Sequence, residues 1–399
     1  MTASTRQHET SAIEHGTLAL YLLVILFGSL FIQSSAGLRQ SLLFLIGIGL
    51  GISLLQAMFG FTGGWRQFIR NYDSKGIRAQ ILLIILTSIF FFPILGQVFS
   101  EQTPAGAIAP IGYSVLIGAF LFGIGMQLGG GCGSGTLFTA GQGQVDMLIT
   151  MAFFIIGATM GSAHLAWWFE LGDLGTYSLV KEVGWLPGLF MTIAALLLLY
   201  GLVRWIDKRK NQSILPVYQS TPVNKIIPTL IYGKWPIWWA VISLAVLNLL
   251  TLLVAGHPWS ITYAFGLWGT KIWAAVGGDV SQWEYWLLGY PSQSLDRSVL
   301  LDNTSVMNFG LIIGAGLAAN LGSRFAPAMT LTKNKLFAVI IGGLLLGYGA
   351  RLAFGCNIGA LLAGISSGSL HGWLWLVAAF IGNMVGTHLR VFIKLDKAF

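Results

Sequence analysis

Long apolar runs separated by short polar segments dominate this chain. Runs long enough to cross about 30 Å of hydrocarbon begin near nine positions, which are Leu18, Ile77, Gly106, Met147, Trp185, Trp235, Ser305, Lys335 and Gly372. Residues 41–70 and 259–276 are also apolar, but glycine-rich stretches interrupt them, with Gly60, Thr62 and Gly63 in the first and Gly266 and Trp268 in the second. A bilayer tolerates broken backbone only where protein or water satisfies it, so we expect two re-entrant hairpins. The pattern predicts an all-α polytopic membrane protein with about nine transmembrane helices plus broken short helices.

The composition agrees with a membrane protein. Of the 399 residues, 55% are hydrophobic and only 9% are charged, which is too little charge for a soluble surface. The net charge of +8 does not indicate nucleic acid, because Lys and Arg lie in short clusters between apolar runs, at 66–78, 204–210, 324–335 and 390–397. The positive-inside bias predicts that these clusters face the cytoplasm. With nine spans, the N-terminus is then expected outside and the C-terminus inside.

The two halves of the chain repeat each other. When residues 118–161 are laid on 342–386, most glycines of the two segments coincide, and Cys132 falls on Cys356. A weaker match lays residues 59–60 on 265–266. The predicted topology runs the two cysteine segments in opposite directions, so we expect two inverted repeats whose broken helices meet at the membrane centre. The boundaries follow as an N-terminal tail (1–17), a first repeat (18–210), a proline-rich cytoplasmic linker (211–234) and a second repeat (235–399).

Cys132 and Cys356 are the only cysteines, and each lies in a glycine break, with Gly131 and Gly133 around the first and Gly355 before the second. A helix that restarts after such a break presents free N–H groups and its positive dipole end, which together favour an anion. A neutral thiol there can donate a weak hydrogen bond without repelling the anion. The alternative is a small buried filler, a frequent role of cysteine. Duplication at the same repeat position favours function.

Arg351 precedes Cys356 by five residues in an otherwise apolar segment, whereas its repeat counterpart, Gln127, is neutral. A guanidinium in the hydrocarbon layer is costly and predicts a function, here attraction of an anion. The alternative is that Arg351 pins the carbonyls of the broken helix or snorkels. Further candidates for polar or aromatic lining of the same cavity are Asn357, Ser134, Thr62 and Trp268.

Several chemistries lack a motif. The sequence has no Cys-x-x-Cys spacing, no Walker-type phosphate loop and no histidine array for haem. The expected spans hold no deeply placed Asp or Glu, which disfavours a proton relay or a cation pump. We therefore expect no metal and no cofactor, and a transporter instead of an enzyme.

Three motifs resemble the YeeE/YedE family of bacterial inner-membrane sulfur transporters. They span residues 122–135, 347–359 and 61–66. The resemblance covers nearly the whole chain and implies an hourglass-shaped thiosulfate transporter, in which Cys132 and Cys356 pass the ion through hydrogen bonds between thiol and sulfur. The sequence departs from the thiosulfate type in lacking a third cysteine, where it has Gly60 and Phe61. It also has Arg351 at a position that is neutral in that type, and there it resembles the selenium-associated branch.

These observations predict uptake of a small sulfur-containing anion, thiosulfate first, across the lipid bilayer. An alternative within the class is transport of a selenium species or another sulfur species. An alternative of another class is a membrane thiol redox or persulfide-transfer enzyme. A soluble sulfur-handling partner is compatible with the basic linker, although no motif indicates one.

Overall fold

The computed structural model describes residues 3–99, 104–211, 214–218, 221–222, 225–325 and 331–397, with side chains from Gly16 onward. Within this part, ten segments are long and apolar enough to cross a membrane. Their long helices are α1 (Ala3–Ala36), α2 (Leu38–Gln56), α4 (Lys75–Leu95), α5 (Tyr113–Gly129), α7 (Val145–Glu170), α9 (Trp185–Lys210), α11 (Ile237–Ala255), α14 (Asn303–Leu321), α15 (Lys333–Leu352) and α17 (His371–Phe392). The prediction of an all-α polytopic membrane protein is confirmed.

Shorter elements connect the long helices. They are α3 (Phe61–Asn71), α6 (Gly133–Gly141), α8 (Leu179–Glu182), α10 (Ile226–Ile231), α12 (Thr262–Ala275), η2 (Glu284–Leu287), α13 (Gly289–Asp296), η3 (Val299–Leu301), the π-helical turn η4 (Asn357–Leu362) and α16 (Ala363–Ser366). The described strands are β1 (Pro110–Gly112) and β2 (Asp173–Thr176), which pair antiparallel with Pro110 opposite Thr176. The expected linker thus contains α10, and the expected N-terminal tail is helical from Ala3.

Two details of the predicted breaks need correction. Residues 41–70 are not one hairpin, because α2 alone has 19 residues, enough to span, and this helix raises the count from nine to ten. The second break does not lie at Gly266 and Trp268, because α12 runs without interruption through both. The chain breaks earlier, between α11 and α12, where Gly256 caps α11 in the left-handed conformation (φ 74°) and Pro258 follows. Glycine at 266 serves close packing instead of a turn.

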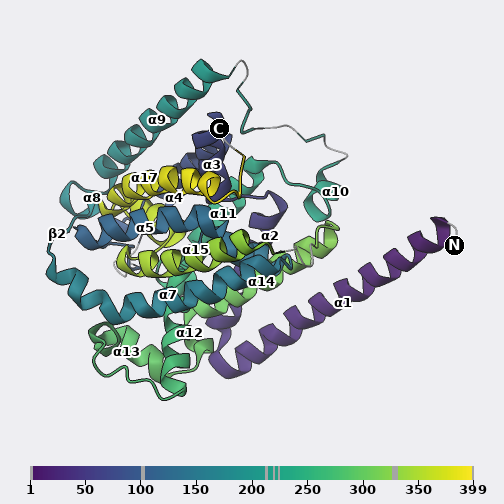
Figure 1. The fold of residues 1–399 in the computed structure, drawn as a ribbon, viewed down its shortest axis with the longest axis horizontal. Coiled ribbons are helices and arrows are strands. Elements are labelled where there is room, and N and C mark those ends of the chain that lie inside the picture. The colour runs from purple at the N-terminus through teal and green to yellow at the C-terminus, as the bar shows by residue number, and fades with distance from the viewer. Residues whose placement is uncertain are drawn as a thin grey trace.

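A layer of four helices, in the order α17, α5, α15 and α7, forms the centre of the molecule (Figure 1). The middle pair, α5 and α15, crosses antiparallel with backbone against backbone. A Cβ atom added at Gly118 would lie 2.8 Å from the carbonyl oxygen of Gly349, and one added at Gly125 would lie 2.9 Å from that of Gly342. Membrane helices approach this closely only where the interface residues are small.

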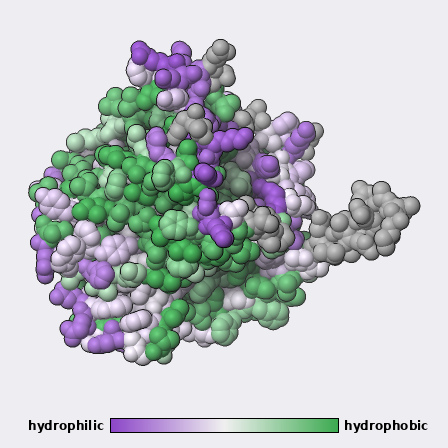
Figure 2. Space-filling view, in the orientation of Figure 1, coloured by the Kyte–Doolittle hydropathy of each residue, from purple (hydrophilic) through white to green (hydrophobic). Residues whose placement is uncertain are grey.

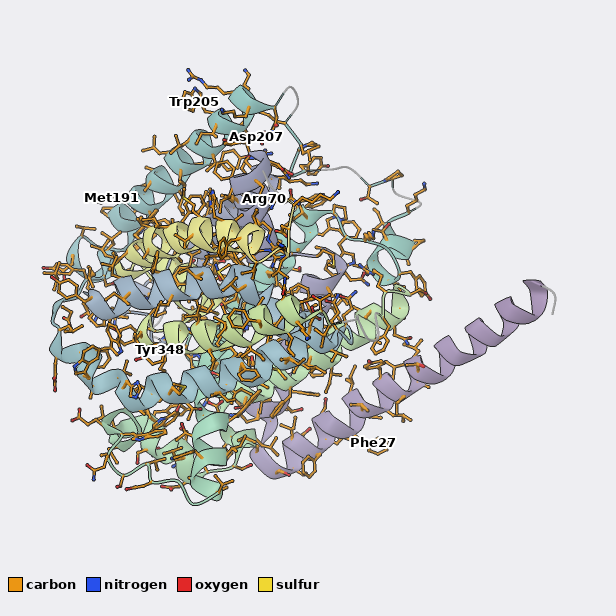
Figure 3. The ribbon with its side chains drawn as sticks, in the orientation of Figure 1. Phe27, Arg70, Met191, Trp205, Asp207 and Tyr348 are labelled. Atoms are coloured by element: carbon orange, nitrogen blue, oxygen red, sulfur yellow. The ribbon has the colours of Figure 1, made fainter. Side chains whose placement is uncertain are left out.

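The outer surface is suited to lipid. Figure 2 shows hydrophobic residues over much of the visible face, with hydrophilic residues at its top, along its lower left and in a band to the right of its middle. Helix α1 illustrates this most clearly, since Phe27 is 64% exposed and points away from the body (Figure 3). Large apolar side chains on α9, such as Met191, are exposed in the same way. Exposed apolar surface of this extent requires a bilayer as solvent.

Candidate functional site

The first cysteine lies where the chain leaves α5 and restarts as α6. Gly130 caps α5 in the left-handed conformation (φ 83°), and Cys132 takes the extended N-cap position of α6. Its carbonyl oxygen accepts the backbone N–H of Thr136 at 2.8 Å. Its thiol is 1% exposed and lies 3.4 Å from Oγ of Ser134, beside the first turn of α6. The thiol therefore occupies the cradle of free N–H groups at the start of the helix.

The second cysteine repeats this arrangement. Gly355 adopts φ 147°, which a residue with a side chain rarely reaches, and Cys356 is the extended N-cap of η4, which continues directly into α16. The Cys356 carbonyl accepts the N–H of Ala360 at 2.8 Å, four residues on, as at Cys132. The backbone N–H of Ile358 donates to the fully buried Cys356 Sγ at 3.4 Å. Both breaks thus place a buried thiol at the N-cap of a short helix, although only the Cys356 thiol accepts a backbone N–H there.

The two cradles meet. A Cβ atom added at Gly133, the first residue of α6, would lie only 3.1 Å from Cys356 Sγ and 3.5 Å from Cγ2 of Ile261. Both cysteines are free thiols. We call the meeting place of the two helix starts at Cys132 and Cys356 the junction. Glycine at 133 leaves the space that the Cys356 thiol uses.

Two buried polar side chains lack hydrogen-bond partners, and one of them belongs to the residue after Cys356. Asn357, directly after Cys356, is 0% exposed, and within the described part of the chain neither its amide oxygen nor its amide nitrogen has a hydrogen-bond partner. The hydroxyl of Thr62 is likewise buried and unpaired. A buried unsatisfied amide costs about 1 to 3 kcal/mol, so such groups require an explanation. A polar ligand that enters the junction would be close to the Asn357 amide, which directly follows Cys356.

Arg351 carries an uncompensated charge near the end of α15. Its Nε and one terminal nitrogen are buried without a partner in the described part of the chain, so it pins no carbonyl there. The guanidinium carbon lies 3.6 Å from the ring centroid of Tyr285 and 5.0 Å from that of Trp286. On another side it approaches Gly266, where an added Cβ would lie 3.6 Å away. The aromatic faces stabilise the cation and leave its donors available.

Sequence reasoning missed the aromatic residues around Arg351. Tyr285 and Trp286 belong to η2, in the polar stretch between α12 and α14, where no local pattern distinguishes them from interfacial aromatic residues. Gly266, which the sequence did single out, lies next to the Arg351 guanidinium.

Gln127 is fully engaged. Its amide oxygen accepts Nε of Arg66 at 2.7 Å, and its amide nitrogen donates to Oδ1 of Asn383 at 2.6 Å and more weakly to the carbonyl of Thr62 at 3.4 Å. Sequence reasoning did not select Arg66 as a site residue, although Arg66 is the last residue of the motif at 61–66. The structure thus brings Gln127 and Thr62 together.

The remaining predicted residues lie apart. Gly60 is the N-cap of α3, and together with Gly63 it lines a cavity of about 340 Å³ that also borders Asp73 and Lys75. Trp268 donates to Oγ of Ser305 at 2.8 Å and stacks on Phe309, which gives it a packing role against α14.

The spanning helices define a multi-pass membrane protein, in which two broken helices meet at a buried junction. Residues 56–385 match the family model described as sulphur transport, and the chain belongs to this family. The resemblance found in the motifs is confirmed.

Curated relatives agree with this assignment. The thiosulfate transporter TsuA of Spirochaeta thermophila is 27% identical over 343 residues, which cover 85% of this chain and 95% of that protein. TsuA of Escherichia coli is 26% identical over 357 residues, covering 87% and 93%. The probable transporter YedE of Escherichia coli is 30% identical over 164 residues, 40% of either chain. The family is one of sulphur transport, so the chain is a transport protein and not an enzyme.

Proposed function

We propose that this protein takes up a small sulfur-containing anion, thiosulfate first, across the bacterial inner membrane through the junction. Both relatives that match most of its length are named thiosulfate transporters. The single observation that carries the proposal is the approach of Cys356 Sγ to Gly133, which puts two buried thiol cradles from distant parts of the chain at one place.

The chemistry of the cradles suits such an anion. The N–H groups at two helix starts supply partial positive charge without a fixed cation that would hold the ion. The thiols donate weak hydrogen bonds to sulfur or oxygen, and the unpaired amide of Asn357 offers a further donor. Weak donors at several points allow an ion both to enter and to leave.

Arg351 attracts the anion toward the junction. It lies five residues before Cys356 and keeps two buried guanidinium nitrogens unpaired. Since no carboxylate neutralises it in the described part of the chain, its charge acts on an anion in the path.

Two inverted repeats around the junction, forming an hourglass, remain part of the proposal. Pairs of equivalent contacts support them. Gly118 packs on Gly349 and the repeat-equivalent Gly342 packs toward Gly125, so exchanging the halves reproduces the contact. The boundaries at 210 and 235 belong to the same proposal, and a soluble partner stays a prediction.

The sides of the two termini remain open to measurement. An even number of crossings returns the chain to its starting side, so ten spans predict both termini in the cytoplasm, whereas nine predicted the N-terminus outside.

The test is uptake of radiolabelled thiosulfate into proteoliposomes, backed by growth on thiosulfate of a bacterium that lacks its own uptake routes. We expect uptake by the wild type, loss in Cys132→Ala and Cys356→Ala, and normal uptake in Gly201→Ala, whose added Cβ meets nothing within 4 Å. No uptake by well-expressed wild type would refute thiosulfate as the substrate. Selenium species and other sulfur anions would then be tested as substrates in the same vesicles.

Cysteine to serine variants distinguish passage of the anion by hydrogen bonds from covalent transfer of sulfur through a persulfide. Serine keeps a hydrogen-bond donor but cannot form a persulfide. Residual uptake in Cys132→Ser and Cys356→Ser would favour hydrogen bonding, whereas complete loss in each would leave covalent transfer open.

A further inference from the structure

Arg351 has no charged counterpart on α5, but the structure supplies one from another helix. Gln127 lies five residues before Cys132, as Arg351 lies five residues before Cys356. The Arg66 side chain from α3 reaches the end of the Gln127 side chain, with Nε donating to Oε1 at 2.7 Å. A guanidinium therefore lies beside each broken helix. One belongs to Arg351 itself, and the other, from Arg66, contacts the residue that precedes Cys132 by the same five positions.

The two charges lie at opposite ends of the four-helix layer. Helices α5 and α15 cross antiparallel, as the contacts of Gly118 with Gly349 and of Gly125 with Gly342 require. Gln127 and Arg351 are near the C-terminal ends of these antiparallel helices, so they lie toward opposite ends of the pair. Arg66 and Arg351 thus flank the junction from opposite directions.

Further arginines gather around Arg66. Arg390 of α17 donates to the carbonyl oxygen of Gln127 at 2.7 Å, and both Arg390 and Arg70 are close enough to interact electrostatically with Arg66. Figure 3 marks Arg70 on α3. Within the described part of the chain, the hydrogen bond to Gln127 is the only one that the Arg66 side chain makes, so its terminal nitrogens remain available.

A carboxylate from the C-terminal segment already occupies this cluster. Asp396 accepts a two-pronged hydrogen bond from Arg390, at 2.9 and 2.8 Å, and forms an ion pair with Arg70 at 3.4 Å. The hydrogen bond from Arg390 holds the pKa of this carboxyl below its usual range, so it is ionised at neutral pH. Within the described part of the chain, this carboxylate takes up the donors of Arg390 and pairs with Arg70, whereas Arg66 makes no hydrogen bond to it and keeps its terminal nitrogens for a second anion.

We propose that Arg66, together with Arg70 and Arg390, forms a second anion-binding station on the opposite side of the junction from Arg351, and that Asp396 competes with the transported anion for it. The inference rests on the proposed function, since it gives the anion a place to bind after or before the cysteines. Planar guanidinium groups bind oxyanions through paired hydrogen bonds, which is how Arg390 holds Asp396.

The test compares four variants in the vesicle uptake assay. Arg66→Gln should raise the thiosulfate concentration for half-maximal uptake about tenfold, the lower range for one hydrogen bond to a charged group. Arg66→Lys should have a smaller effect because it keeps the charge. Asp396→Asn should lower that concentration, because the competing carboxylate is gone. The matched control is Arg209→Gln, which removes an equal charge at the end of α9, where Arg209 lies over Trp205.

The thiosulfate concentration for half-maximal uptake is expected to rise in Arg66→Gln and to fall in Asp396→Asn. This difference in sign distinguishes a role in binding from a structural role. If Asp396 only stabilised the fold, Asp396→Asn would weaken uptake as Arg66→Gln does, and that result would overturn the proposal. So would an Arg66→Gln variant that behaves like Arg209→Gln.

Failure of the transport proposal would not leave the station untested. Thermal stabilisation of the detergent-purified protein is measured with added thiosulfate and sulfate. Stabilisation of the wild type and of Arg209→Gln that is lost in Arg66→Gln supports the station even without thiosulfate uptake. No stabilisation of the wild type by either anion overturns it.

Discussion

Replacing Gly133 by alanine tests the junction more directly than removal of a thiol. The added Cβ would lie 3.1 Å from Cys356 Sγ, while Ile261 stands 3.5 Å away on another side and limits escape. At Gly135 the corresponding distance to Cys132 Sγ is 3.6 Å, an ordinary contact. Gly133→Ala therefore has to displace the Cys356 thiol by about 0.5 Å, the difference between these two distances.

The expected consequence is lost transport in a protein that still folds. Alanine at the first position of α6 improves helix propensity by up to about 1 kcal/mol, which offsets the cost of a contact relieved by a few tenths of an ångström. Loss of one well-placed hydrogen bond to a charged ligand costs about 1.5 kcal/mol or more, so uptake should fall at least about tenfold.

The assay is initial thiosulfate uptake into proteoliposomes, with the thermal unfolding midpoint measured on the same preparation. Gly135→Ala serves as the graded control, with little predicted displacement of its neighbouring thiol. Wild-type uptake by a correctly inserted Gly133→Ala protein would refute the reasoning, because the close approach at the junction would then have no part in transport.

Three further outcomes are expected. Gly342→Ala should lower the unfolding free energy by about 1 to 3 kcal/mol, since its Cβ would lie 2.2 Å from the backbone of α5. Gly201→Ala, whose Cβ meets nothing within 4 Å, should unfold at the wild-type temperature or above it. If the two variants had the same unfolding midpoint, the packing argument would be wrong. Asp146→Asn should lower the free energy of unfolding by about 1 to 3 kcal/mol, because Asp146 is 3% exposed and pairs with Lys335 at 2.6 Å. The same substitution should cost less in a Lys335→Met background, where the ion pair is already absent. Reporter fusions should place both termini in the cytoplasm, and an external N-terminus would show that one of the ten helices does not cross.

The fold class was predictable because it depends on local composition. Apolar runs of sufficient length become helices in lipid wherever they occur, since each backbone N–H and C=O group must find its hydrogen-bond partner within the run. The prediction was less accurate at residues 259–276, because a glycine can mark either a break or a close contact between helices. The break lay at Gly256 and Pro258, while Gly266 allows α12 to approach Arg351.

The candidate site was predictable only in part. The glycine runs located both cysteine breaks, because a chain that needs free N–H groups and left-handed backbone requires glycine in its own sequence. The sequence also identified Arg351 as an unusual charge in an apolar run. Sequence alone determined the membrane class, both breaks and the residue types at them.

Only the tertiary structure decided which of these residues meet. It brought Cys356 against Gly133, Arg66 against Gln127, and the rings of η2 against Arg351. These partners are more than 60 residues apart in sequence, and their contact depends on how closely whole helices pack. That packing is set by many small residues acting together, which no local pattern reveals.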